Sequence, residues 1–503
     1  MRQLSGHDAS FLYSDTVNAN SNATFVQIYD QSTAPGGKVR FKSILAHIES
    51  RLHHSPVFRR KLKRVPLELD FPYWVDDEHF DLEYHVRHIA LPAPGDWRQF
   101  CIQASRIHAR ALDLNRPLWE IYVIEGLDAF IDLPKGSFAL LTKIHHAAID
   151  VERHHEIVEV LHDTTRRPPR PEPPEPWFPE RAPGALALTC RSLLPPRRLV
   201  APLARMAPAA RAFARELLRP DEHTAVRFNS VVSPHRVFDT RRFTLDEFQR
   251  ISRLVAGATV DDAVLAVCAG GLRRYLDEHG ELPEADLAAT TPAHPDLTDP
   301  RHHKARAVQL GTLLQDPLQR LALIHAQTSG AESSAPSAAP ALAGRLFGRS
   351  SLDGVPGLPG TACTITPVPG PDVPMYLNGA RMTYFSAILP IADGMGLVFA
   401  VTHYDGRVVI SPTCCRELMP DPQAFTQCVR DSFQELLALA DARPAQHPRQ
   451  VQAAPASRRP LRPAKPGGSS SGKRAPASQK VQKAAIAPAA AKAARPRSTT
   501  PPR

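Results

Sequence analysis

The chain has 503 residues, more than one hydrophobic core usually supports, so two lobes are expected. Hydrophobic residues make up 43% of it, yet no run of about 18 uncharged apolar residues occurs, which excludes an obvious membrane-spanning helix. The formal charge of +10 belongs to the last 60 residues, which hold thirteen lysines and arginines and no acid, so the rest of the chain carries −3.

The first 163 residues are predicted to form one lobe of mixed helices and strands. Apolar residues recur at helical spacing over 41–52 and 97–112. Residues 119–125 and 137–144 are short, mostly apolar runs that are typical of buried strands. Pro117 precedes the first of these strands and predicts a turn, so the block around it is expected to be architectural.

The second of these strands is followed by His145-His146, and Asp150 comes four residues after His146. Imidazole titrates near neutral pH, so a histidine at a strand end can act as a general base toward a hydroxyl of the substrate. A metal site is the alternative, because on one continuous helix His146, Asp150 and His154 would share a face and could bind zinc. The preceding strand disfavours such a helix, and no metal is predicted.

Residues 164–234 are predicted to connect the two lobes. Their first part, 164–184, is dense in proline, arginine and glutamate, which predicts an extended and solvated linker. In residues 185–219 apolar positions alternate with seven arginines, and Glu216 is the one acid. This pattern fits a pair of surface helices that bridges the lobes, or an interfacial helix whose arginines meet anionic lipid.

Residues 235–441 are predicted to form a second mixed lobe. A hairpin is expected to turn at Asp405-Gly406. Asp261 and Asp262 open a predicted helix, where acids are favoured electrostatically, so capping is preferred to catalysis for this pair. Helices are expected over three stretches: 245–254, 261–275 and 423–440.

Residues 442–503 are a basic tail rich in proline, alanine and lysine, and are predicted to be disordered. The charge predicts attraction to anionic membranes, and only nonspecific attraction to nucleic acid, because the tail holds no aromatic residue for base stacking. The seven cysteines are odd in number and widely spaced apart from the adjacent Cys414 and Cys415, which together with the polar N-terminus predicts a reduced cytoplasmic protein.

Five blocks follow one another along the chain: MRQLSGHDASFL from residue 1, NRPLWE from 115, HHAAID from 145, GATVDDAVLA from 257, and VPGP with YLNGAR from 368. In this order they resemble the bacterial wax ester synthase/diacylglycerol acyltransferase family. The resemblance covers about residues 1–440. It implies an α/β fold of two chloramphenicol acetyltransferase-like lobes with mixed sheets and an active-site channel at their interface.

By this resemblance His146 is the general base that deprotonates the hydroxyl of diacylglycerol or a long-chain alcohol, whose oxygen then attacks acyl-CoA. The product is triacylglycerol or a wax ester; acyl-CoA is a co-substrate, and no cofactor is implied. The lipid substrates imply peripheral contact with a membrane or a lipid inclusion. The other implied site residues are His145 and Asp150, as supporting residues, and Val151, Asp261, Pro369 and Gly370, as substrate-binding residues.

Three motifs depart from the family pattern. Val151 stands where the family has glycine. Glycine readily adopts a positive φ, whereas a β-branched residue adopts it only with strain. Asp261 replaces an asparagine, and Thr366-Pro367 replace Ser-Asn. These departures leave a second hypothesis open, that of a catalytically weak relative which binds acyl chains or lipid surfaces.

Overall fold

The protein is described by a computed structural model, which covers residues 1–130, 133–149, 156–168, 176–192, 226–292, 305–329 and 360–442. All of these belong to one compact unit, Met1–Pro444. The predicted disordered tail and most of the arginine-rich stretch lie outside these ranges. Among the helices within them, none is both long and apolar enough to cross a bilayer.

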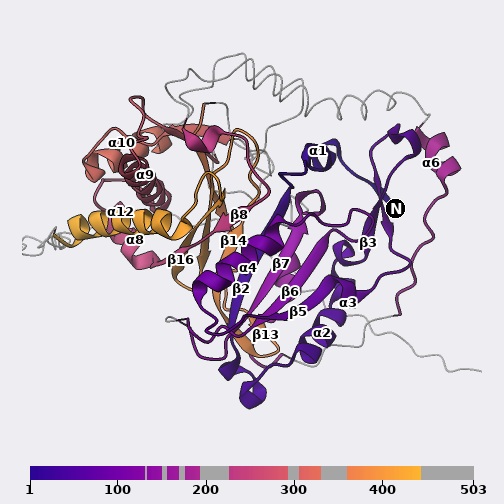
Figure 1. Ribbon diagram of the computed structural model, residues 1–503. Helices are drawn as coiled ribbons and strands as arrows, with labels where there is room; N and C mark the ends of the chain where they lie inside the picture. Colours follow the sequence, from indigo (N-terminus) through magenta and orange to yellow (C-terminus); the bar gives the residue numbers. More distant parts are fainter. Residues whose placement is uncertain are drawn as a thin grey trace, which may run out of the picture. The chain divides into compact units, whose positions relative to one another are not determined.

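A six-stranded sheet forms the centre of the N-terminal lobe, in the strand order β13-β14-β2-β7-β6-β5 (Figure 1). The central strand β7 is buried along its whole length and pairs antiparallel with both β2 and β6. Both strands predicted here are confirmed. The bounds are β2 Asn22–Asp30, β5 Val86–Ala90, β6 Trp119–Glu125, β7 Phe138–His145, β13 Tyr376–Leu377 and β14 Ala380–Ile388.

Helices and a small second sheet complete this lobe. The helices predicted over 41–52 and 97–112 are confirmed as α2 and α4, each slightly shorter than expected. The small sheet has the order β1-β4-β3. The helices are α1 Gly6–Ser14, α2 Phe41–Glu49, α3 Leu82–His85, α4 Trp97–Ala109, α5 Glu156–Val160 and α6 Ala185–Ser192, and the strands are β1 Arg2–Gln3, β3 Arg60–Lys63 and β4 Tyr73–Asp76.

The C-terminal lobe is built on a sheet of seven strands in the order β11-β10-β12-β15-β16-β8, with β9 also paired to β16. β10, β12 and β15 run parallel, so their carboxyl ends lie at one edge. The predicted hairpin is confirmed: Asp405 and Gly406 both have positive φ, 49° and 71°, as a tight turn between twisted strands requires. The bounds are β8 Arg236–Phe238, β9 Arg241–Thr244, β10 Ala288–Pro292, β11 Ala305–Gln309, β12 Cys363–Val368, β15 Val398–Tyr404 and β16 Arg407–Cys415.

Four helices gather on one side of this sheet (Figure 1). α9 and α12 approach each other closely because glycines stand at their contact: a Cβ on Gly271 would lie 2.7 Å from Val429. All three helices predicted for this lobe, α8, α9 and α12, are confirmed. The bounds are α8 Leu245–Ser252, α9 Val260–Glu278, α10 Pro317–Ser329 and α12 Pro422–Ala442.

The C-terminal part of the chain contributes a strand to the sheet of the N-terminal lobe. β14 comes late in the chain, yet it pairs with β2 of the N-terminal sheet from Ile388 opposite Thr24 onward. The Tyr384 hydroxyl lies 2.6 Å from that of Thr240, next to β9. Sheet membership therefore does not follow chain order, and the sequence analysis did not predict β2 or β14 as strands.

The predicted linker is less solvated than expected. Residues 176–184 form no helix or strand, but Trp177 packs under the Arg59 guanidinium, 4.7 Å from ring centroid to Cζ. The Glu180 amide donates a hydrogen bond of 3.0 Å to Asp76 of β4. An aromatic ring and a free backbone amide both gain partners on the small sheet, which holds this part of the linker against the N-terminal lobe.

Candidate active site

His145 ends β7 and is held in place from both ring nitrogens. Its side chain is 1% exposed. Nε2 lies 2.9 Å from Asp15 Oδ2, and Nδ1 accepts the Ala147 amide at 3.1 Å. Because Nδ1 accepts, the proton is on Nε2 and is donated to the carboxylate. With both nitrogens engaged, His145 orients the backbone of the motif rather than reaching a substrate.

The Asp15 carboxylate also positions His146, through hydrogen bonds to and from the backbone of Ser21. The Ser21 amide donates to Asp15 Oδ1 at 2.7 Å, and the Ser21 carbonyl accepts the His146 amide at 2.8 Å. His146 is half-buried as a residue, but its Nε2 atom is buried, and its ring lies beside Phe11, with ring centroids 5.4 Å apart. Asp15 thus positions both histidines. Sequence analysis missed it because no spacing rule links residues 130 positions apart.

After His146 the chain forms a single 3-10 turn, η6 (His146–Ala148), and Ile149 is already extended, with φ −80° and ψ 118°. A helix that begins at His146 is therefore interrupted at Ile149, which argues against the zinc alternative. The predicted supporting residue Asp150 and the predicted substrate-binding residue Val151 lie outside the described residues. Within those residues, no group of three or more His, Cys, Asp or Glu side chains has the arrangement of a metal site.

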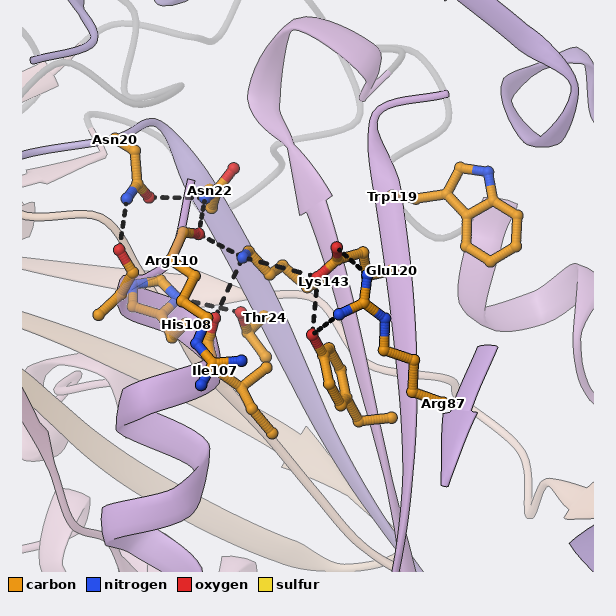
Figure 2. A network of polar contacts seen from close by, with 12 residues as sticks. Asn20, Asn22, Thr24, Arg87, Ile107, His108, Arg110, Trp119, Glu120 and Lys143 are labelled. Atoms are coloured by element: carbon orange, nitrogen blue, oxygen red, sulfur yellow. Dashed lines mark hydrogen bonds and ion pairs between the residues drawn. The ribbon is translucent and has the colours of Figure 1, made fainter. Parts of the chain in front are cut away.

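A buried network of polar side chains surrounds the strand that carries the histidines (Figure 2). Lys143, two residues before His145, has a fully buried side chain. Its Nζ donates to the carbonyls of Ile107, at 3.1 Å, and Arg110, and lies 4.0 Å from Glu120. Burial lowers the pKa of Lys143 to about 8, against the opposing charge of Glu120. The ammonium thereby ties the carboxyl end of α4 to β7.

The last turn of α4 brings a third histidine, His108, into this region. It is 1% exposed, and its Nδ1 lies 2.9 Å from the Thr24 hydroxyl (Figure 2). Burial holds the pKa of His108 well below its usual value, and the charges of Arg236, Lys143 and His146 lower it further. His108 is therefore neutral at physiological pH. It packs beside the histidine motif as a structural element.

A second polar region lies in the C-terminal lobe, at the edge where β10, β12 and β15 end. A cavity of about 300 Å³ opens there, next to the first turn of α9. Helix α9 contributes both apolar and polar residues to its lining. The lining includes Val264, Leu265, Ile365, Pro367 and Val401 as apolar residues and Asp261, Asp262, Thr291, Arg306 and His325 as polar ones.

The two aspartates of this region have different environments. Asp262 caps α9: its carboxylate accepts the Thr259 amide at 2.9 Å, and it also binds His325 at 3.0 Å and Thr328 at 2.5 Å. Burial alone would raise the pKa of Asp262, but these hydrogen bonds together lower it. The predicted capping role is therefore found at Asp262, whose acceptor atoms are engaged within the protein.

Asp261 instead faces the cavity. It is exposed through the cavity mouth, yet neighbouring atoms surround much of the carboxyl group, and this burial raises the pKa of Asp261. The imidazole of His403 on β15 lies nearby. Its positive charge favours the ionised carboxylate and so partly offsets this rise in the pKa of Asp261. Burial in turn lowers the pKa of His403. A carboxyl group at an apolar cavity can accept a hydrogen bond from a hydroxyl or amide of a bound molecule.

Comparisons with known proteins agree with this geometry. A family model described as the wax ester synthase/diacylglycerol acyltransferase catalytic domain matches residues 4–264, and the corresponding C-terminal domain matches residues 305–437. A putative diacylglycerol O-acyltransferase of Mycobacterium tuberculosis, MT1809, is 31% identical over 88% of this chain and 92% of its own length. The chain belongs to the wax ester synthase/diacylglycerol acyltransferase family.

One further relative supports the family assignment, and one solved structure shows the same fold. The O-acyltransferase WSD of Acinetobacter baylyi is 30% identical over 75% of this chain and 84% of its own length. The solved wax ester synthase/diacylglycerol acyltransferase from Marinobacter aquaeolei VT8 has the same fold, with a TM-score of 0.65 at 24% identity over 87% of this chain and 100% of that one. The family and the mixed α/β, two-lobed fold expected from the sequence are confirmed.

The remaining family block places Pro369 and Gly370 just after β12. A Cβ on Gly370 would lie 2.5 Å from the His403 carbonyl oxygen and 3.1 Å from the Phe385 ring, so only glycine fits where this segment packs against β14 and β15. Pro367, which precedes the block, lines the cavity. Trp119 of the second block begins β6 and is fully buried, and its indole donates to Phe58, which confirms the architectural interpretation.

Proposed function

We propose that this acyltransferase transfers a fatty acyl group from acyl-CoA to a long-chain alcohol or diacylglycerol, with His146 as general base. One observation carries the assignment of the base. Of the two motif histidines, His145 has both ring nitrogens engaged, with Asp15 and with the Ala147 amide, and is 1% exposed, whereas His146 is half-buried as a residue and its Nε2 atom is buried. Because both nitrogens of His145 hold the backbone in place, His146 is the motif histidine proposed to take the proton.

The proposed reaction needs no covalent enzyme intermediate. His146 takes the proton of the acceptor hydroxyl as its oxygen forms a bond to the thioester carbon. The carbon–sulfur bond then breaks, and the CoA sulfur leaves with the proton that His146 returns. Asp15 and His145 hold the motif backbone during both steps, and Asp150 is proposed as a further support. Acyl-CoA is the donor in this scheme, and no cofactor takes part.

The cavity beside α9 is proposed to receive part of a substrate. Its wall is mainly apolar, which suits an alkyl or pantetheine-like chain, and Asp261 offers a hydrogen-bond acceptor. A channel between the lobes would let the donor and the acceptor arrive from different sides. The acceptor is a lipid, so we also propose peripheral contact with a membrane or lipid inclusion. Nucleic acid is not proposed as a partner.

The test is an assay with radiolabelled palmitoyl-CoA, once with hexadecanol and once with diacylglycerol as acceptor. Labelled wax ester or triacylglycerol is expected, and the ratio of the two defines the acceptor preference. Binding of acyl-CoA without product from either acceptor would contradict the proposal. That result would favour the catalytically weak relative that the departures at Val151 and Thr366-Pro367 leave open.

A further inference from the structure

An exposed apolar surface lies beside the small sheet of the N-terminal lobe, where α6 contacts the turn η5 (Pro66–Glu68). Leu67 is 87% exposed and Leu186 is 82% exposed. Figure 1 shows α6 near β3 and the N-terminus. We call this surface the η5–α6 patch and define it by Leu67, Ala185, Leu186, Ala187 and Cys190, all of which are exposed.

The helix that carries the patch is held against the small sheet by a buried side chain. On the same helix Leu188 is 1% exposed and packs into a small apolar cluster with Val65, Tyr73 and Val75. Residues 186 and 188 are separated by about 200° around a helix, so burying one side chain turns the other outward. α6 is therefore anchored by Leu188 and presents Leu186 to the surroundings.

The backbone of η5 also presents its leucine outward. Leu67 has φ 54° and ψ 11°, and Glu68 has φ 50°. This left-handed conformation is unfavourable for residues with a Cβ, and it usually persists where packing or function requires it. Leu67 gains little burial in return, because its side chain points into solvent. A strained turn that displays an apolar side chain is a feature of surfaces that meet a partner.

The charges around the patch are mainly positive. Lys63 and Arg64 precede η5 and are exposed, and Arg191 is exposed on α6. Arg64 is paired with Glu68 at 2.8 Å, which leaves Lys63 and Arg191 uncompensated within this group. The exposed apolar side chains suit the acyl layer of a lipid surface, and the basic side chains around them suit its anionic headgroups.

We infer that the η5–α6 patch docks this enzyme onto a lipid surface containing anionic phospholipid, with Leu67 and Leu186 inserted below the headgroups. The inference rests on the proposed function, because an enzyme that acylates a lipid alcohol must collect it from a lipid phase. It goes further by naming the surface and the two side chains that enter the lipid.

Cys190 allows a direct test, because it is the exposed cysteine of the chain and the other six are buried. The full-length protein is labelled there with an environment-sensitive fluorophore and mixed with vesicles of phosphatidylcholine and phosphatidylglycerol. A blue shift on addition of vesicles is expected. Protein that co-sediments with vesicles while the probe keeps its aqueous spectrum would overturn the inference. So would a spectrum that is already blue-shifted without vesicles and depends on protein concentration, because a second copy would then cover the patch.

The double variant Leu67→Ser/Leu186→Ser is expected to bind these vesicles at least tenfold more weakly, since each leucine removed from lipid costs about tenfold in affinity. Val231→Ser is the matched control, because Val231 is 72% exposed elsewhere, and binding should not change. Equal binding by the double variant would contradict the inference. Acyl transfer to a short, water-soluble alcohol should stay the same in all three proteins, so a failure of the proposed function is detected separately.

Discussion

The two lobes contain the same pairing of an aspartate with a histidine but use it in different surroundings. In the N-terminal lobe Asp15 binds His145 at 2.9 Å, and in the C-terminal lobe Asp262 binds His325 at 3.0 Å. In each case the residue next to the pair in sequence, His146 or Asp261, is more exposed than its paired neighbour. The paired residues hold the backbone, and their neighbours are the ones that we propose to meet a substrate.

The difference lies in what surrounds each pair. The N-terminal pair stands at the end of a fully buried strand, beside the buried Lys143 and His108. The C-terminal pair stands at the first turn of a helix, on the wall of an open cavity. We therefore expect changes in the N-terminal lobe to affect turnover and changes in the C-terminal lobe to affect helix stability and substrate affinity. Four sets of substitutions test this division.

Replacing His146 with alanine is expected to have the largest effect. Loss of a general base lowers the rate by about 10²–10⁴-fold, while the half-buried residue contributes little to the core. The measurements are acyl transfer to hexadecanol and urea unfolding. The exposed residue His53 provides the control, and His53→Ala should leave both unchanged. A folded His146→Ala protein with normal turnover would reject the assignment of the base.

Asp15→Ala should lower both activity and stability. It leaves the Nε2–H of the buried His145 and the Ser21 amide without their acceptor, which costs about 1–3 kcal/mol. Because the His146 amide is bound to Ser21, turnover should fall by roughly 10–100-fold through misplacement of the base. Asp15→Asn, which keeps one oxygen acceptor, should recover part of the stability. A stable, fully active Asp15→Ala protein would show that the carboxylate does not position the motif.

In the C-terminal lobe the adjacent aspartates should separate stability from binding. Asp262→Ala removes the acceptor of Thr259, His325 and Thr328, and should lower the free energy of unfolding by about 1–3 kcal/mol. The pKa of Asp262 is lowered in the folded state, so its stabilisation is present above the ordinary value of 3.8 and is lost as pH falls below it. Asp261→Asn should leave unfolding unchanged and alter KM by a few-fold. The reverse result would exchange the two roles.

The smallest expected effect concerns the buried ammonium of Lys143. Its pKa is about 8 in the folded state and 10.5 ordinarily, so between these values the unfolded chain binds a proton that the folded state has lost. Stability from this group therefore rises with pH across that window, by at most about 1.4 kcal/mol per pH unit. Relative to Lys143→Met, the natural protein should gain stability from pH 8 to pH 10. The exposed Lys135→Met serves as the control, and a difference independent of pH would contradict the buried position.

Local features of the fold followed from the sequence with good accuracy. The strand predicted over 119–125 has these bounds, and the turn at Asp405-Gly406 is where it was expected. Such features depend on neighbours along the chain, because apolar periodicity and glycine conformations act over a few residues. The histidine motif at the end of a strand belongs to the same class, and so did the recognition of the family from five short blocks.

Other features depend on residues brought together from distant positions. The sequence by itself determined most of the longer helices, the strands at 119–125 and 138–145 and the hairpin at Asp405-Gly406, and that His145-His146 stands at a strand end. Only the tertiary structure decided that Asp15 fixes this motif, that Lys143 binds the end of α4, and that β14 completes the N-terminal sheet. The reason is physical: local periodicity records which face of an element is buried, whereas long-range partners are selected by packing and by the need to satisfy buried polar groups.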